Sequence, residues 1–130
     1  MATKVVTVGE LLDAAKKSPL DWTQNLYLKY DNSDDRMPFA GCFFGKAAYQ
    51  LGVSPATIPA VLLDHGLPAS PIIAYNDLQA QTFPEVLEFA EKLLRPYAKV
   101  ELALYSWEYI YPPKPRTLRV RISEWLRRLV

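Results

Sequence analysis

The sequence TFPEVLEFAEKLL, residues 82–94, contains the strongest helix signal in the chain. Thr82 and Glu85 have the spacing of a capping box, in which the two side chains satisfy free backbone amides of the first turn. The apolar side chains that follow recur at helical intervals and form one wide stripe, which ends before Pro96. The segment therefore predicts an amphipathic helix packed on a hydrophobic core.

A second capping box lies near the start of the chain, where Thr7 is followed by Glu10. Leu11, Leu12 and Ala15 then share one face at helical spacing. We expect a helix over residues 8–17, ended by the proline at position 19.

Residues 40–51, AGCFFGKAAYQL, predict a buried helix. Gly52 follows and is suited to a left-handed C-cap. Farther along, Ser70-Pro71 has the order of a cap residue and a first-turn proline, which predicts one or two helical turns over the residues after it.

Ser54-Pro55 carries the same cap-then-proline signal. The helix that it predicts would end at Gly66. Pro59 lacks an amide hydrogen, so this helix is expected to start late or to bend at that position.

Two segments between these helices lack helical periodicity. Residues 21–30 favour short extended structure, and residues 31–36, DNSDDR, predict a polar loop. A calcium site does not fit this loop, because its sixth position is Arg36 rather than glycine and no glutamate stands at the twelfth. We expect a solvated loop without a metal.

The C-terminal part of the chain differs in character. Residues 99–111, KVELALYSWEYIY, alternate in a way that favours a strand or extended arm with one aromatic face. A proline link over residues 112–115 follows. Residues 118–129 then have helical spacing with arginines mostly off the apolar stripe, although a hairpin strand could come first.

The predicted fold class is therefore mainly α (α+β). We expect a helical body over residues 1–95, with four to five helices and a short extended segment. Residues 96–130 would form a strand-plus-helix extension packed on the body or on a partner. A chain of 130 residues, half of them hydrophobic, fits one domain with a single core.

Composition excludes several classes of protein. No apolar stretch is long enough to cross a bilayer, and the first residues lack a signal-peptide pattern, so a cytoplasmic protein is expected. Cys42 is the single cysteine and His65 the single histidine. An internal disulfide and a structural zinc site are therefore excluded, and no cofactor is expected.

Charge is distributed unevenly along the chain. Residues 1–91 contain six Lys/Arg and eleven Asp/Glu, whereas residues 92–130 contain nine and three, which gives −5 and +6 and the total of +1. A basic C-terminal surface suits an acidic partner, a second copy of the protein or nucleic acid.

Four short motifs occur in a fixed order: Trp22-Thr-Gln24, Cys42-x-x-Gly45-Lys-Ala, Tyr75-Asn-Asp77 and Thr82-x-x-Glu-Val-Leu87. Together they resemble a family of uncharacterised small proteins of actinobacteria and their bacteriophages, whose pattern is W-x-Q, C-x-x-G-A, W-N-D and T-x-x-E-V-L. The similarity covers about residues 8–94.

This chain departs from the family pattern at two positions, with Tyr75 in place of tryptophan and Lys46 after the glycine. The resemblance implies a phage or actinobacterial cytoplasm as the setting. It implies no activity.

Candidate catalytic groups are few. Cys42 near a helix start could have a lowered thiol pKa and act as a nucleophile, but its neighbours Phe43 and Phe44 favour a buried, inert thiol. His65 precedes Gly66 at a predicted helix end, where a capping role is favoured over that of a general base. The sequence does not establish an enzyme, and a protein without catalytic activity is favoured.

A ligand site could form from Trp22, Gln24, Cys42, Asn76 and Asp77. Each residue also has a structural explanation. Asn76-Asp77 is a common means of stabilising a turn through side-chain to backbone hydrogen bonds, and a tryptophan in a small domain is often a core anchor.

Three functional hypotheses follow. The leading one is a non-enzymatic, phage-encoded interaction protein that binds a bacterial protein or itself through exposed aromatic and basic C-terminal residues. The expected contacts are Tyr105, Trp107, Tyr109, Tyr111, Arg119 and Arg121.

The alternative is a nucleic-acid-binding module. Its phosphate contacts would come from Arg116, Arg119, Arg121, Arg127 and Arg128. The third hypothesis is a ligand-binding or enzymatic site near Trp22, Cys42 and Asp77.

Overall fold

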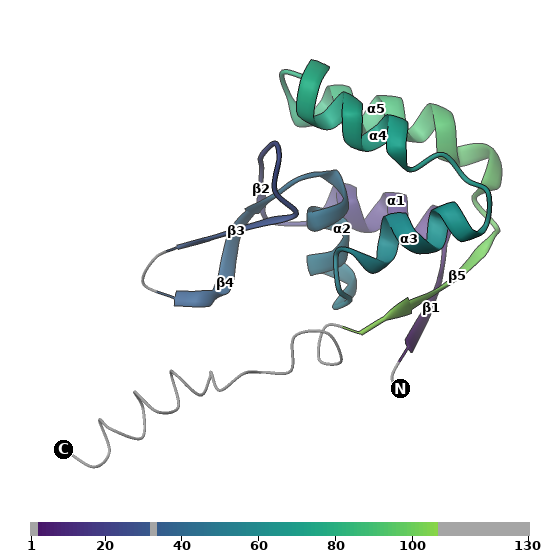
Figure 1. Ribbon diagram of the computed structural model, residues 1–130, viewed down its shortest axis with the longest axis horizontal. Coiled ribbons are helices and arrows are strands. Elements are labelled where there is room, and N and C mark those ends of the chain that lie inside the picture. The colour runs from purple at the N-terminus through teal and green to yellow at the C-terminus, as the bar shows by residue number, and fades with distance from the viewer. Residues whose placement is uncertain (1–2, 32–33, 107–130) are drawn as a thin grey trace, which may run out of the picture.

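The computed structural model describes residues 3–31 and 34–106. These residues form an α+β fold in which helices surround a single hydrophobic core, with one small sheet at each end (Figure 1). The helices in chain order are α1 Val8–Lys17, α2 Phe43–Leu51, α3 Thr57–Asp64, α4 Ser70–Ala74, the π-helix η1 Tyr75–Gln79, α5 Phe83–Leu94 and the 3₁₀ turn η2 Arg95–Tyr97.

The strands are β1 Thr3–Thr7, β2 Asp21–Trp22, β3 Leu28–Asp31, β4 Asp34–Gly41 and β5 Glu101–Tyr105. β1 and β5 pair antiparallel, with Val5 opposite Ala103. In the other sheet β4 lies between β2, which is parallel to it, and β3, which is antiparallel. None of the described helices is long and apolar enough to cross a membrane.

Two helices begin where their capping boxes predict. In α1 the amide of Glu10 donates to Thr7 Oγ1 (3.0 Å), and Glu10 Oε1 accepts from the amide of Thr7 (2.7 Å). In α5 a carboxylate oxygen of Glu85 accepts from the amide of Thr82 (2.9 Å). Both predictions are confirmed. The sequence could predict these helix starts because every contact that fixes them lies within one turn.

The helix predicted over residues 40–51 begins later, at Phe43. Ala40 and Gly41 instead belong to β4, where they pair with β2 and β3. The predicted polar loop over residues 31–36 is also wrong for residues 34–36, which lie in β4. Pro38 argues against a central strand, but it lies next to an irregularity in the β3–β4 register, where a strand tolerates proline. Gly52 has the predicted left-handed conformation, with φ of 74°.

Helix α3 begins at Thr57, so Ser54 is not its N-cap. The amide of Ser54 donates to Tyr105 O (3.0 Å), which ties this residue to the end of β5. The late start that Pro59 predicts is confirmed. Gly66, with φ of 72°, follows the helix end as expected.

The strand predicted within residues 99–111 is present as β5, and no strand was predicted for its partner β1. Leu102 and Leu104 are fully buried in the same core as α1 and α5, while Tyr105 on the other face is 38% exposed. The start of the predicted extension is therefore continuous with the core of the body. Residues 107–130, which include the predicted proline link and terminal helix, lie outside the described residues.

Candidate functional site

The segment after β2 is joined to the π-helix η1 by side-chain hydrogen bonds. Trp22 Nε1 donates to Asn76 Oδ1 (2.7 Å). Gln24 Nε2 donates to the carbonyl oxygens of Asn76 (3.1 Å) and Ala80 (3.0 Å). The Trp-x-Gln motif therefore binds the Asn-Asp motif, and we call Trp22, Gln24, Asn76 and Asp77 the polar junction.

Asn76 is the centre of the polar junction and is only 1% exposed. Its Oδ1 also accepts from the amide of Phe43 (3.1 Å), and its Nδ2 donates to Thr23 O (3.3 Å) and Asp77 Oδ1 (2.8 Å). These contacts use both lone pairs and both amide hydrogens. Asn76 therefore joins protein segments and has no hydrogen bond left for a ligand.

The predicted turn at Asn76-Asp77 is wrong, because both residues lie within the π-helix. The amide of Ala80 donates to Tyr75 O (2.8 Å), which is the wide i to i+5 bond of that helix. A π-helical turn is less stable than an α-helical one and often occurs at functional sites. Here the hydrogen bonds from Gln24 and Trp22 stabilise it.

Gly45 allows the backbone of the 25–27 segment to approach α2. A Cβ added at Gly45 would lie 1.6 Å from Tyr27 O, and one at Gly41 would lie 2.9 Å from the same atom. Only glycine fits at position 45 without moving this backbone. The glycine of the Cys-x-x-Gly motif is therefore required for the position of Tyr27.

Cys42 is the N-cap of α2, and its Sγ accepts from the amide of Gly45 (3.4 Å). Burial raises the pKa of the thiol from its usual value near 9.0 to about 11, against weaker opposing effects of hydrogen bonds from backbone amides. The thiol is therefore neutral near pH 7. The nucleophilic role considered for Cys42 is not favoured by this environment.

Lys46, on the next turn of α2, is only 5% exposed. Its Nζ donates to the carbonyl oxygens of Ser18 (3.4 Å) and Leu20 and lies 4.6 Å from the ring centre of Phe83. Burial lowers the pKa of Lys46. The side chain joins α2 to the end of α1 and α5, and it does not line the pocket described next.

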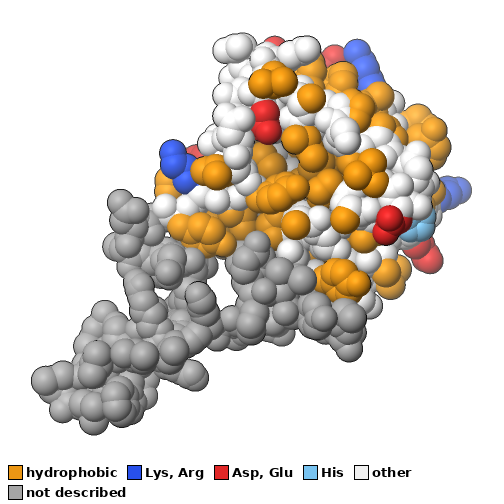
Figure 2. Space-filling view, in the orientation of Figure 1, with side chains coloured by type: hydrophobic (Ala, Val, Ile, Leu, Met, Phe, Trp, Pro, Cys, Tyr) orange, Lys and Arg blue, Asp and Glu red, His pale blue; other side chains and the backbone are white. Residues whose placement is uncertain are grey.

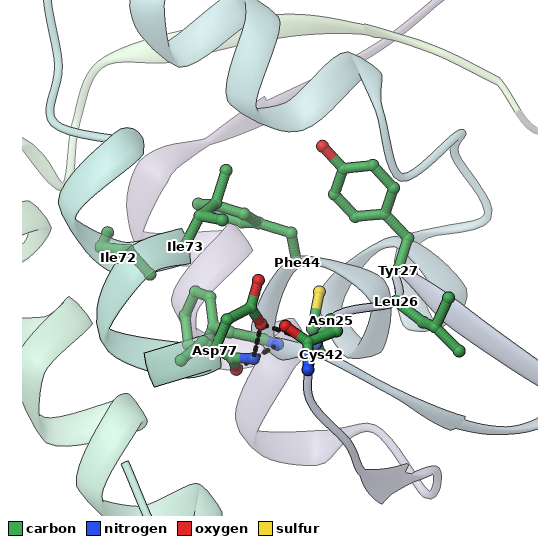
Figure 3. A pocket seen from close by; sticks show the side chains of 10 residues that line it. Asn25, Leu26, Tyr27, Cys42, Phe44, Ile72, Ile73 and Asp77 are labelled. Carbon is green, nitrogen blue, oxygen red and sulfur yellow. Dashed lines mark hydrogen bonds between the residues drawn. The ribbon is translucent and has the colours of Figure 1, made fainter. Parts of the chain in front are cut away.

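A pocket of about 210 Å³ lies between α2, α4, η1 and the segment after β2 (Figure 3). Its walls are mainly apolar, and Asn25, Cys42 and Asp77 lie close together on one side, apart from the hydroxyl group of Tyr27 (Figure 3). The apolar lining residues are Leu26, Phe43, Phe44, Ile72 and Ile73, and the others are Asn25, Tyr27, Cys42, Asn76 and Asp77. This combination of apolar walls and a few grouped polar atoms is typical of small-ligand sites.

Asp77 supplies the charged group of the pocket. Its Oδ1 accepts from the amide of Asn25 (2.8 Å) and from Asn76 Nδ2 (2.8 Å). Figure 3 shows both bonds on one carboxylate oxygen, with the other oxygen pointing away from them. Within the part of the chain that the structure describes, this second oxygen has no hydrogen bond and Asp77 has no ion pair.

Asn25, whose amide donates to Asp77, has a left-handed backbone conformation, with φ of 69°. Asparagine tolerates this conformation better than most residues do. This left-handed conformation directs the amide of Asn25 toward Asp77. The turn after β2 and the π-helix therefore meet at a hydrogen bond in the lining of the pocket.

The structure brings together all five residues of the predicted ligand site. Cys42, Asn76 and Asp77 line the pocket, whereas Trp22 and Gln24 hold Asn76 without lining it. The remaining lining residues were not predicted as site residues. No sequence signal marks Ile72 or Leu26, because apolar residues of this kind also occur throughout the core.

The other predicted residues that the structure describes do not line this pocket. Tyr105 lies on β5, and His65 is the exposed C-cap residue of α3. Trp107, Tyr109, Tyr111, Arg119 and Arg121 lie outside the described residues. Among residues 3–31 and 34–106, no group of three His, Cys, Asp or Glu side chains is arranged as a metal site.

No protein-family model, curated protein or solved structure matches the chain.

Proposed function

We propose that this chain is a small non-enzymatic binding protein and that the pocket beside Asp77 is its binding site. The observation that supports this proposal most directly is a cavity of about 210 Å³ with apolar walls and one carboxylate oxygen that lacks a partner among the described residues. We place the protein in the cytoplasm of a bacterium or of a phage-infected host, as the motif resemblance implies.

The polar junction supports a binding role because it holds the pocket in shape before a ligand arrives. Asn76 makes hydrogen bonds to three residues in two other segments, at Trp22, Thr23 and Phe43. A pocket whose walls are fixed in advance loses less conformational entropy on binding than a pocket that must form. The network therefore favours recognition of a ligand by a preformed site.

The chemistry of the lining favours binding over catalysis. The pKa of Cys42 is raised to about 11 by burial, so a thiolate nucleophile is scarce near neutral pH. Lys46 donates to backbone carbonyls away from the pocket. Among the described lining residues, no nucleophile is hydrogen-bonded to a general base.

Binding at the pocket can be tested by nuclear magnetic resonance of the full, ¹⁵N-labelled chain with a set of small cationic, neutral and anionic aromatic probes. We expect at least one probe to shift the amide signals of Asn25, Cys42 and Asp77 in a saturable way. Ile73→Trp should fill part of the pocket and abolish these shifts while the rest of the spectrum is retained. Absence of saturable shifts for every probe would contradict the proposed site.

A second candidate function is protein association through the C-terminal region. It is supported by the half-exposed ring of Tyr105 on the outer face of β5 and by the net charge of +6 over residues 92–130. Trp107, Tyr109 and Tyr111 share the sequence parity of Tyr105. Exposed aromatic residues next to arginines are typical of protein interfaces.

Light scattering over a range of salt tests this second candidate. The truncated chain should end after Ser106, because Leu102 and Leu104 are part of the core. We expect the full chain to associate and the truncated chain to stay monomeric and folded, with Trp107→Ala weakening association by about 2 kcal/mol. Folded monomers for both chains would exclude self-association and leave a different partner to be sought by pull-down, and association of both chains would exclude the C-terminal region as its surface.

Nucleic-acid binding by the C-terminal arginines remains a prediction of the sequence. It requires affinity for a duplex or single strand that falls steeply as salt is raised. Absent or salt-independent binding would exclude it.

A further inference from the structure

Among the described residues that line the pocket, the side-chain charge is negative. Asp77 carries a carboxylate, and no lysine or arginine of the described residues lines the pocket or pairs with this group. Its Oδ1 is already held by the amide of Asn25 and by Asn76, whereas the second oxygen has no such partner in the described part of the chain. A carboxylate beside apolar walls is stabilised most by a cation that also donates a hydrogen bond.

The same lining disfavours other ligand charges. An anion would approach Asp77 without any cation of the described lining to offset the repulsion. A neutral apolar molecule would displace water from the second carboxylate oxygen without replacing its hydrogen bond. The polar side of the pocket therefore selects a positively charged donor.

The shape of the pocket limits the rest of the ligand. Phe43, Phe44, Ile72 and Ile73 supply apolar walls of the pocket. An apolar cavity of about 150 Å³ can hold benzene, so a volume of about 210 Å³ accommodates one ring or a short alkyl chain. The apolar walls favour a stem without further polar groups.

We infer that the pocket binds an ammonium or guanidinium group on a short apolar stem, with the cation at the second carboxylate oxygen of Asp77 and the stem between the Phe43–Phe44 and Ile72–Ile73 walls. This inference rests on the proposed binding function and specifies its ligand class. Two sources supply such a group: a free small amine, or a lysine or arginine side chain of another polypeptide.

Exposed leucines could distinguish a free amine from a side chain of another polypeptide as the source of the cationic group. Leu26 lines the pocket and is 50% exposed, and Leu78, next to Asp77, is 80% exposed. Figure 2 shows that hydrophobic side chains also gather across the middle of one face of the molecule. A polypeptide could contact exposed leucines that a free amine would not reach, and the experiment below compares the two sources.

The test uses the full chain and three probes of nearly equal size: 2-phenylethylammonium, 2-phenylethanol and phenylacetate. Affinities are measured by the shifts of the Asn25, Cys42 and Asp77 amide signals. We expect the ammonium probe to bind about tenfold more tightly than the alcohol, and phenylacetate to bind most weakly. The preference for the ammonium should decrease as salt is raised, whereas the affinity of the alcohol should change little.

Asp77→Asn is the decisive variant, because its side-chain oxygen can still accept from Asn25 and Asn76 while the negative charge is removed. It should lose the tenfold preference and keep the affinity for the alcohol. Glu88→Gln on the exposed surface of α5 removes the same charge outside the pocket and should keep the preference. N-acetyl-lysine and N-acetyl-arginine methylamides represent the polypeptide source.

Tighter binding of the blocked residues, with additional shifts at Leu26 and Leu78, would support the inference and assign the polypeptide source. Tighter binding of the free amine would support it and assign the small-molecule source. Equal binding of the ammonium and the alcohol, or a preference that persists in Asp77→Asn, would overturn the inference but leave the binding function intact. Absence of binding by all probes would overturn both.

Discussion

The α1–α5 side of the molecule and the polar junction are stabilised by contacts of very different range. The capping boxes of α1 and α5 join residues three positions apart. The hydrogen bonds of Trp22, Gln24 and Asn25 to η1 and its C-cap Ala80 join residues 52 to 56 positions apart. The first region can form locally, whereas the second exists only when distant segments have already come together.

This difference has consequences for stability and for binding. A lost cap affects one end of one helix, and the rest of that helix still packs through its apolar stripe. A lost contact in the junction leaves several buried polar groups without partners, because Asn76 makes hydrogen bonds to three residues in two other segments. Substitutions in the junction should therefore cost more and should also alter the pocket.

The largest effect is expected for Gly45→Ala. Its Cβ would lie 1.6 Å from Tyr27 O, so the segment after β2 must move away from α2. We expect a loss of about 3 kcal/mol in the free energy of unfolding, measured by urea denaturation. Chemical shifts of the pocket amides should change as well.

Gly52→Ala is the matched control for this substitution. Gly52 has φ of 74°, but nothing lies within 4 Å of an added Cβ. The cost should be about 1 kcal/mol, from backbone conformation alone. Equal losses for the two variants would show that close packing at Gly45 is not what positions Tyr27.

The second effect concerns the reactivity of Cys42. Its pKa of about 11 is two units above the usual value of 9.0, so the thiolate should be about a hundredfold scarcer at pH 7 in the folded chain than in the unfolded chain. We expect alkylation by iodoacetamide to be slower by about that factor in the native protein than in urea. Nearly equal rates would indicate an accessible, reactive thiol.

The same pKa predicts the pH dependence of stability. The folded chain holds its thiol proton more tightly than the unfolded chain, so the stabilising contribution is complete below pH 9.0 and is lost as pH rises through about 11. Cys42→Ser should weaken this component of the alkaline loss, as measured by urea denaturation at several pH values.

Asn76→Ala should destabilise the fold by about 2 kcal/mol, because Trp22 Nε1 and the amide of Phe43 lose their acceptor. The indole NH signal of Trp22 should also shift. Gln79→Ala, at an exposed position of the same π-helix, is the control and should change stability little. If Asn76→Ala were equally neutral, the junction would not be the element that holds η1.

The smallest effect is expected for Thr7→Ala. It removes one capping hydrogen bond at the start of α1 and should cost about 1 kcal/mol by thermal or urea denaturation. The signals of the pocket amides should stay in place, since the contact is local. A pocket perturbation as large as that of Asn76→Ala would remove the distinction between the two regions.

Sequence patterns predicted the local elements and failed where pairing partners decide the structure. The helix over residues 8–17 has its cap, its apolar face and its end signal within about a dozen residues. Strand β4 was missed because aspartates and Pro38 disfavour a strand, and only pairing with β2 and β3 offsets that preference. Helix α3 was placed too early because the contact between Ser54 and Tyr105 is invisible in the local sequence.

The same distinction between local sequence signals and tertiary contacts applies to the candidate site. The sequence identified Trp22, Gln24, Cys42, Asn76 and Asp77 as residues that could belong together. Their roles depended on tertiary contacts, which saturate Asn76, raise the pKa of Cys42 and leave one oxygen of Asp77 directed away from its partners. The apolar lining residues had no distinguishing signal, because burial in a core and exposure to a pocket require the same residue types.

Local sequence patterns predicted the α+β class, the capped helices α1 and α5, and the glycines that follow α2 and α3, because these features depend on contacts within a few residues. The pairing of β1 with β5, the central position of β4, the π-helix and the pocket beside Asp77 depend instead on how the chain is arranged in three dimensions. They require hydrogen bonds and packing between segments far apart in the chain, whose partners no local pattern specifies.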